Sequence, residues 1–142
     1  MSEPLSRFTV SIPQSLLEQF DAVSAGKGYG SRSEAVRDAI RDSLVEHQWT
    51  ESREAGEVVG TIVLVYDHQT RRTSEELIDQ QHHHHHNVLS SLHIHLDERN
   101  CLEVIVVRGT GSEVSHLADA LISLRGVKHG RLVCSTTGTD LA

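Results

Sequence analysis

The chain has 142 residues, of which 37% are hydrophobic and 4% aromatic, and its formal net charge is −7 at pH 7. This length suits one ordinary domain or two small ones, no apolar run approaches the ~20 residues of a membrane span, and the negative charge argues against a protein that coats nucleic acid electrostatically. Because we find no secretion signal, and two cysteines are too few for a disulfide scaffold, we expect a cytoplasmic protein.

The first 50 residues predict a strand followed by two helices. Residues 6–12 alternate strictly, which is typical of a half-buried strand. Pro13 ends this strand and suits the first turn of a helix, and glycines mark the turn that follows. Ser31 with Glu34 three residues later predicts a capping box at the start of a second helix. We expect that helix to end near Trp49 and this first domain to span residues 1–50.

A lone strand of about seven residues is not stable by itself. Two copies that pair antiparallel across a dimer axis would be stable, and such a two-stranded ribbon fits the major groove of DNA. Its outward face would present the polar side chains to bases and phosphates: Arg7, Thr9 and Ser11. An ordinary exposed edge strand explains the same pattern equally well.

The rest of the chain predicts a second domain over residues 57–142, after a polar linker at 51–56. The expected order is strand, helix, strand, strand, helix, strand, with ranges 58–66, 74–81, 88–96, 102–108, 112–124 and 127–135. This order is the β-α-β-β-α-β ferredoxin-like arrangement, and it makes the whole chain an α+β protein.

One strand of this domain carries a candidate metal site. In Leu92-His93-Ile94-His95-Leu96, both histidines project from one face, and we expect the apolar residues to pack on the other. Cys101 follows a turn-like segment and joins the histidines only if the hairpin loop has an odd length, which is the register we predict. Imidazole and thiolate ligands suit zinc, copper and nickel. A fourth ligand is missing, and the tract His82–His86 is the obvious supply.

Each of these features also has a plainer interpretation. The histidine tract is equally typical of a solvated helix end that binds metals loosely. Cys134 lies in an apolar strand and is expected in the core. Glu34 and Asp38 share one helix face, where two carboxylates suit a hard cation but more often are simply solvated. Four histidines are isolated in sequence, and spacing assigns them no chemistry: His47, His68, His116 and His129.

Taken together, these residues resemble the nickel-responsive transcriptional regulator family (NikR) over roughly residues 6–136. The strand at 6–12 and the segment Gly28–Asp38 resemble its ribbon-helix-helix domain. Gln81 with the tract, then Leu92–His95 and Cys101–Val104, resemble its nickel-binding core.

The resemblance implies a homotetramer, with ACT-like C-terminal domains at its centre and a DNA-binding dimer at each end. It implies a planar nickel(II) site with His93, His95 and Cys101 from one subunit and His82 from its neighbour, eleven residues before His93. It also implies that Glu103 orients a ligand histidine. The further residues it implies are Arg7, Thr9 and Ser11 as base readers, and Glu34 and Asp38 as a site for a second cation such as K+.

The function expected from the resemblance is a nickel-dependent repressor of nickel-uptake genes that binds a double-stranded operator with two half-sites. An enzyme is not expected, because a closed four-ligand site leaves no position for a substrate. A metal-sequestering or delivery protein and a ribbon-helix-helix antitoxin remain as alternatives, and copper or cobalt as the signal. The chain departs from a typical DNA reader in one respect, since residues 1–50 carry five basic and seven acidic groups.

Overall fold

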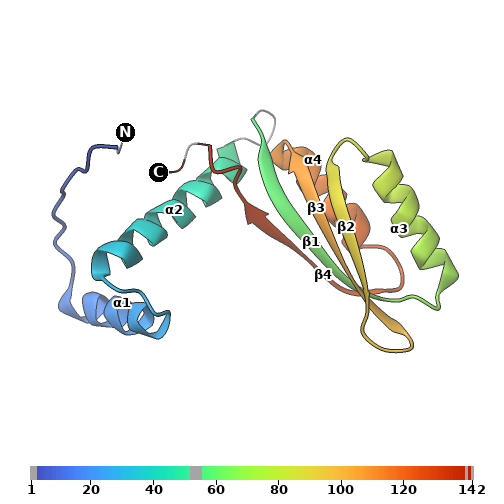
Figure 1. Cartoon of the computed structure of the whole chain (residues 1–142), viewed down its shortest axis with the longest axis horizontal. Helices are drawn as coiled ribbons and strands as arrows, with labels where there is room; N and C mark the ends of the chain where they lie inside the picture. Colours follow the sequence, from blue (N-terminus) through green and yellow to red (C-terminus); the bar gives the residue numbers. More distant parts are fainter. Residues whose placement is uncertain (1–2, 52–55, 140, 142) are drawn as a thin grey trace. The chain divides into compact units, whose positions relative to one another are not determined.

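The structure is a computed structural model that describes residues 3–51, 56–139 and 141. Its elements are α1 (Gln14–Gly26), α2 (Arg32–Glu51), β1 (Val58–Asp67), α3 (Arg71–His83), β2 (Val88–His95), β3 (Asn100–Gly109), α4 (Gly111–Ile122) and β4 (Val127–Ser135) (Figure 1). They form two compact units, which divide within α2 between Leu44 and Val45. Within the described residues, every helix is too short or too polar to cross a membrane.

In the first unit, both predicted helices are present, and one of the two hydrogen bonds of the predicted capping box is formed. The Ser31 hydroxyl accepts the backbone N–H of Glu34 at 3.2 Å, as expected for a capping box. The Glu34 carboxylate instead accepts the N–H of Gly30 at 3.0 Å, one residue before the expected partner. The positive φ of Gly28, 81°, lets the chain turn between α1 and α2.

The strand predicted over residues 6–12 is not present in the single chain, where no strand is assigned to this segment. Its apolar side chains are largely exposed: Phe8 by 70%, Val10 by 65% and Ile12 by 41%. A strand needs a hydrogen-bonded neighbour, and one chain offers this segment none. The sequence pattern therefore describes a structure that a single chain does not complete.

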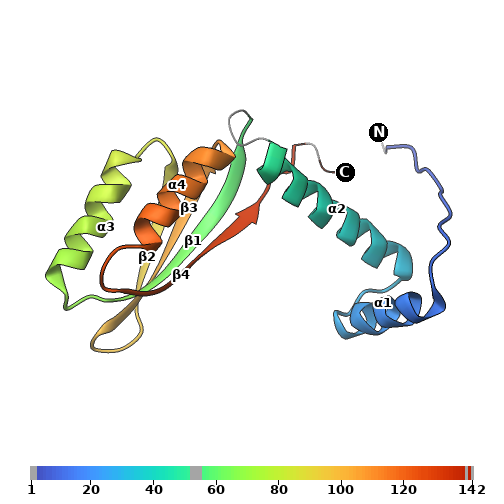
Figure 2. The same cartoon turned by 180° about the vertical axis from the view of Figure 1, so that it is seen from behind.

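The second unit confirms the ferredoxin-like topology. Its four strands are antiparallel in the order β2-β3-β1-β4. Alternate residues of β1 and β3 are buried, so one face of the sheet carries the core. Leu77 of α3 and Leu117 of α4 join that core, which places both helices on the same face of the sheet, as Figure 2 also shows from behind.

Among the described residues of this unit, no helix covers the other face of the sheet, and this corrects one expectation. Leu92, Ile94 and Leu96 were expected to pack, but they are exposed by 57%, 38% and 53% because both crossover helices lie on the opposite face. Cys134 was expected in the core, yet it is exposed on the edge strand β4.

Several side chains fix the ends of these elements. α3 begins three residues earlier than predicted, and ion pairs one turn apart support its first turns, Arg71 with Glu75 and Arg72 with Glu76. α4 ends two residues earlier than predicted, at Ile122, and its first turn has a complete capping box.

The end of α2 is tied to the sheet of the second unit. The Trp49 indole N–H donates to the backbone carbonyl of Ser135 at 2.7 Å, and the Trp49 ring lies over Gly60 of β1. Of the predicted linker at 51–56, Glu51 is the last residue of α2, and residues 52–55 lie outside the described part of the chain.

Candidate metal centre

The β2–β3 hairpin sets the register of the candidate ligands. His95 pairs with Cys101 and His93 with Glu103, so the predicted odd register is confirmed. Asp97 holds the loop closed, since its carboxylate accepts N–H groups of Arg99 and Asn100, each at 2.8 Å. These hydrogen bonds lower the pKa of Asp97 to about 2. The hairpin therefore presents both histidines and the thiol on one face.

The three predicted ligands of one subunit lie at the loop end of this hairpin. His93 Nε2 lies 3.1 Å from Cys101 Sγ, and His95 Nδ1 lies 3.4 Å from the same sulfur. Ligand atoms that share one ion at about 2.0–2.3 Å lie about 3–4 Å apart, so the sulfur is at a suitable distance from each imidazole nitrogen taken singly, although His93 is not in the group whose ligand atoms all lie within 4.8 Å of one another. The imidazole and thiolate donors also have the chemistry that borderline divalent metals prefer.

The thiol of Cys101 is fully buried, whereas the two histidines are exposed. Burial raises the pKa of the Cys101 thiol, and the negative charges of Asp97 and Glu103 raise it further. A metal ion that bound this sulfur as a thiolate would have to displace the thiol proton, which would couple metal binding to proton release.

Tyr66 lies beside the His93 ring, and Glu103 lies near Tyr66. Burial, together with the charge of Glu103 and a hydrogen bond to it, raises the pKa of the Tyr66 phenol well above its usual value. The Tyr66 oxygen lies 3.1 Å from His93 Nδ1. In the tautomer in which Nδ1–H donates to this oxygen, the Nε2 lone pair faces Cys101.

Glu103 is a buried carboxylate with several hydrogen-bond donors around it. Gln81 of α3 donates to it at 2.8 Å and Ser91 of β2 at 2.9 Å. It lies directly opposite His93 in the strand pair, and its negative charge raises the pKa of Tyr66, whose hydroxyl is the group beside that ring. The role of Glu103 in orienting a ligand histidine stays a prediction.

His82 stands apart from the ligands of its own chain. It is exposed near the end of α3 and lines a separate hollow of about 350 Å³ with Gln81, Ser91 and Glu103. Within the described residues, the one group with metal-ligand spacing is His68, His95 and Cys101, and His82 is not in it. In this single chain, His82 does not complete the site.

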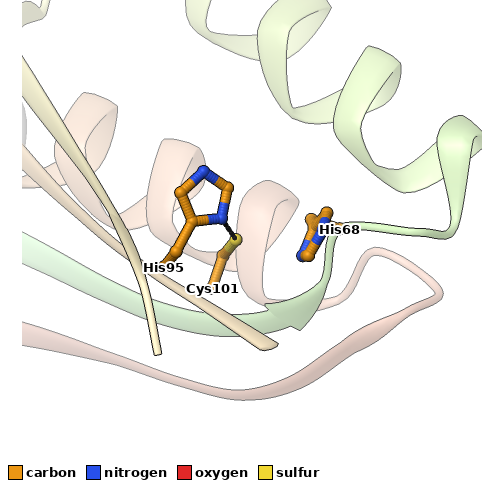
Figure 3. A group of neighbouring side chains, drawn as sticks. All are labelled: His68, His95 and Cys101. Atoms are coloured by element: carbon orange, nitrogen blue, oxygen red, sulfur yellow. Dashed lines mark hydrogen bonds between the residues drawn. The ribbon is translucent and has the colours of Figure 1, made fainter. Parts of the chain in front are cut away.

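His68 is the residue that sequence reasoning missed. It directly follows β1, and its backbone N–H donates to the carbonyl of Arg99 at 2.9 Å, which holds it beside the hairpin loop (Figure 3). Its ring lies edge-on to that of His95, with centroids 5.2 Å apart. An isolated histidine carries no spacing signal, but pairing β1 with β3 in a ferredoxin-like sheet would have brought it next to Cys101.

The other predicted site residues lie in the first unit. Arg7, Thr9 and Ser11 are exposed, as a DNA-facing row requires. Glu34 and Asp38 line one hollow, but each carboxylate already accepts a hydrogen bond, from Gly30 and from the Tyr29 hydroxyl respectively. Arg37 and Arg41 line the same hollow, so the carboxylates stand among cations as well as donors.

Two family profiles match the chain. Residues 59–135 match the NikR C-terminal nickel-binding domain, and residues 6–46 match the ribbon-helix-helix proteins of the copG family. A protein of Geobacter sulfurreducens is 56% identical over 135 residues, and one of Pyrococcus furiosus is 53% identical over 135 residues. In both comparisons the match covers 95% of this chain and 96% of the relative. Both relatives are assigned as nickel-responsive regulators.

Proposed function

The chain belongs to the nickel-responsive regulator family, and from that premise we propose that it is a nickel-dependent DNA-binding repressor. The observation that carries the proposal is the meeting of His93, His95 and Cys101 at the end of one hairpin. These three donors bind from one subunit, and we assign the fourth position to His82 of a second subunit. A nickel ion held there would supply the bonds that join the two subunits.

Association of the C-terminal domains is supported by the bare face of the sheet. Leu92 and Leu96 of the hairpin and Val133 of β4 are each more than half exposed among the residues that the structure describes. Large exposed apolar patches on a soluble protein mark surfaces that bind other proteins. A homotetramer in which two such domains pack face to face would bury this surface, and His82, which lies with the candidate ligands on the helix side of the sheet, would reach a neighbouring ligand set through a different interface.

DNA binding is assigned to residues 6–12 as a two-stranded ribbon made by two copies. The exposed row Phe8, Val10 and Ile12 would become the buried face of that ribbon. Arg7, Thr9 and Ser11 would then face the major groove, where an arginine can bond a guanine with two hydrogen bonds. Two such dimers in one tetramer fit an operator with two half-sites.

The proposed mechanism links metal binding to DNA binding through the relative arrangement of the DNA-binding dimers in the tetramer. Metal binding at a subunit interface favours those arrangements of the DNA-binding dimers in which His82 reaches its neighbour's hairpin. If those arrangements span both half-sites, metal binding and operator binding reinforce each other, and the coupling equals the difference in metal affinity between the arrangements. We also propose that Glu34 and Asp38 hold a second hard cation such as K+, which would relieve the repulsion between these carboxylates.

The test is nickel-dependent binding to an operator selected from random duplexes with the full-length protein. His93→Ala removes one donor and is expected to abolish nickel-dependent binding, while His116→Ala, an exposed histidine on α4, leaves it unchanged. A His93→Ala variant that still binds the operator in a nickel-dependent way would contradict the site assignment. Tight nickel binding by the wild type without retention of any sequence would favour metal sequestration instead.

A further inference from the structure

His68 adds a third donor to His95 and Cys101 from within the same chain. The ligand atoms of these three residues all lie within 4.8 Å of one another. They come from three places that converge at one corner of the domain: the end of β1, the end of β2 and the start of β3. Figure 3 shows the His68 ring on one side of the Cys101 sulfur and the His95 ring on the other.

One ring nitrogen of His68, Nδ1, makes no hydrogen bond. It is buried, one of two such side-chain atoms among the residues that the structure describes. A buried polar atom left without a partner costs about 1–3 kcal/mol. The ring is held in place by the backbone bond from His68 to Arg99 and by its edge contact with His95. A metal ion bound through Nδ1 would give this buried nitrogen a partner.

We propose that His68, His95 and Cys101 form a second metal-binding arrangement that lies entirely within one subunit. Three protein donors of the type N, N and S with one position left to water are typical of a tetrahedral zinc(II) site. Nickel(II) and copper(II) with nitrogen donors prefer a planar set of four, which the proposed function completes with His82 of a second subunit. The intrasubunit arrangement therefore takes a divalent metal without a planar preference, zinc(II) or, as a spectroscopic substitute, cobalt(II).

The two arrangements exclude each other because they share Cys101 and His95. A metal held by His68 leaves His82 of the neighbouring subunit without a bond, so it occupies the thiol without joining the subunits. This consequence rests on the proposed function, whereas the three-donor site itself does not. Zinc bound through His68 would then fill the site without favouring operator binding, and the chain would distinguish nickel from zinc by which histidine completes the set.

The experiment is an anaerobic titration of full-length apo-protein with cobalt(II), followed by visible absorption. The variants are His68→Gln and His82→Gln, with His129→Gln on β4 as a matched control. We expect wild type, His82→Gln and His129→Gln to show the same intense tetrahedral bands with thiolate charge transfer. His68→Gln is expected to lose these bands and to bind cobalt at least about tenfold more weakly. Circular dichroism of each apo-protein checks that the fold is retained.

Titration with nickel(II) gives the complementary pattern and separates the two proposals. The planar nickel spectrum is expected to survive His68→Gln and to be lost in His82→Gln. Unchanged cobalt bands and affinity in His68→Gln would overturn the intrasubunit site, and so would loss of those bands in His82→Gln. Failure of the proposed function appears elsewhere, as wild-type protein whose operator binding does not depend on nickel. Should His68→Gln unfold, the number of imidazoles around zinc in the wild-type and His82→Gln proteins, from X-ray absorption, decides the same question.

Discussion

The two units of this chain differ in what a single copy can bury. The second unit encloses a continuous core between one sheet face and two helices, with Ile62, Leu64 and Leu117 fully buried. In the first unit, the described residues that are buried amount to Ser24 and Ala35, while Phe8 and Val23 remain more than half exposed. A domain without a core needs a partner in order to fold stably. The contrast indicates that association is a condition of folding for the first unit and an addition to it for the second.

The largest effect is expected from a substitution at Phe8, an apolar residue of the first unit that a single chain leaves exposed. Phe8→Ala removes two side chains from each proposed ribbon, and full burial of each is worth about 1.5–3 kcal/mol, so dimers of the first unit should dissociate. Operator binding should be lost while the planar nickel spectrum of the second unit is retained. Thr9→Ala is the control that keeps the apolar face, and it should reduce sequence preference without changing the oligomeric state measured by light scattering. Retention of operator affinity by Phe8→Ala would contradict the obligate ribbon.

A core substitution in the second unit should lower the stability of the fold itself. Leu77 and Ile78 are neighbours on α3 but are 1% and 55% exposed, which makes them a matched pair. Leu77→Ala should lower the free energy of unfolding by about 2–5 kcal/mol, and Ile78→Ala by much less. Urea unfolding of the two variants, each at several protein concentrations, measures this. Equal losses in the two variants would mean that the second unit does not have the core described above.

The next effect concerns the connection that positions α3 on the sheet. Gly126 has a φ of +99°, and a Cβ there would lie 2.1 Å from Thr73 Oγ1, whose hydroxyl donates to the carbonyl of Arg125 at 2.8 Å. Gly126→Ala should therefore cost about 1–3 kcal/mol through backbone strain alone. Thermal unfolding of this variant beside Gly26→Ala, where a Cβ meets open space, separates strain from loss of flexibility. A Gly126→Ala protein as stable as wild type would show that the connection can rearrange.

The smallest effect on stability is expected from Asp97 in the hairpin loop, and it should depend on pH. The folded pKa of Asp97, about 2, lies below the value of 3.8 expected for the unfolded chain, so its contribution is complete above pH 3.8 and disappears as pH falls towards 2. Asp97→Asn should lower the urea midpoint at pH 7, and its deficit relative to wild type should shrink below pH 4. Asp119→Asn on α4 is the control. A deficit that stays constant with pH would mean that the Asp97 charge does not hold the loop.

Residue alternation and helical spacing were sufficient to predict the second unit. β1, β2, β3 and β4 lie close to their predicted ranges, and the register of the hairpin followed from the requirement that Cys101 face His95. The predictions that failed concern contacts that the pattern of a single segment does not determine. The pattern at 6–12 specifies a strand that does not form in the single chain, and Leu92 alternates like a packed residue although it is exposed among the residues that the structure describes.

The site was predicted to the extent that its residues are close in sequence. His93, His95 and Cys101 lie within one hairpin, so a local pattern determines their geometry. His68 comes from a strand that is paired through the sheet, and its role depends on tertiary structure that spacing does not encode. His82 needs one step more, because whether it completes a site depends on a second copy of the chain.

Trp49 gives this molecule a built-in optical reporter. It is the chain's one tryptophan, and its indole N–H donates to Ser135 at the place where α2 meets the end of β4. Excitation at the red edge of protein absorbance therefore addresses a single fluorophore, at the end of the sheet of the second unit. Its emission maximum and quenching by iodide can follow events at this end of the sheet during metal or operator titrations, without any label attached to the protein.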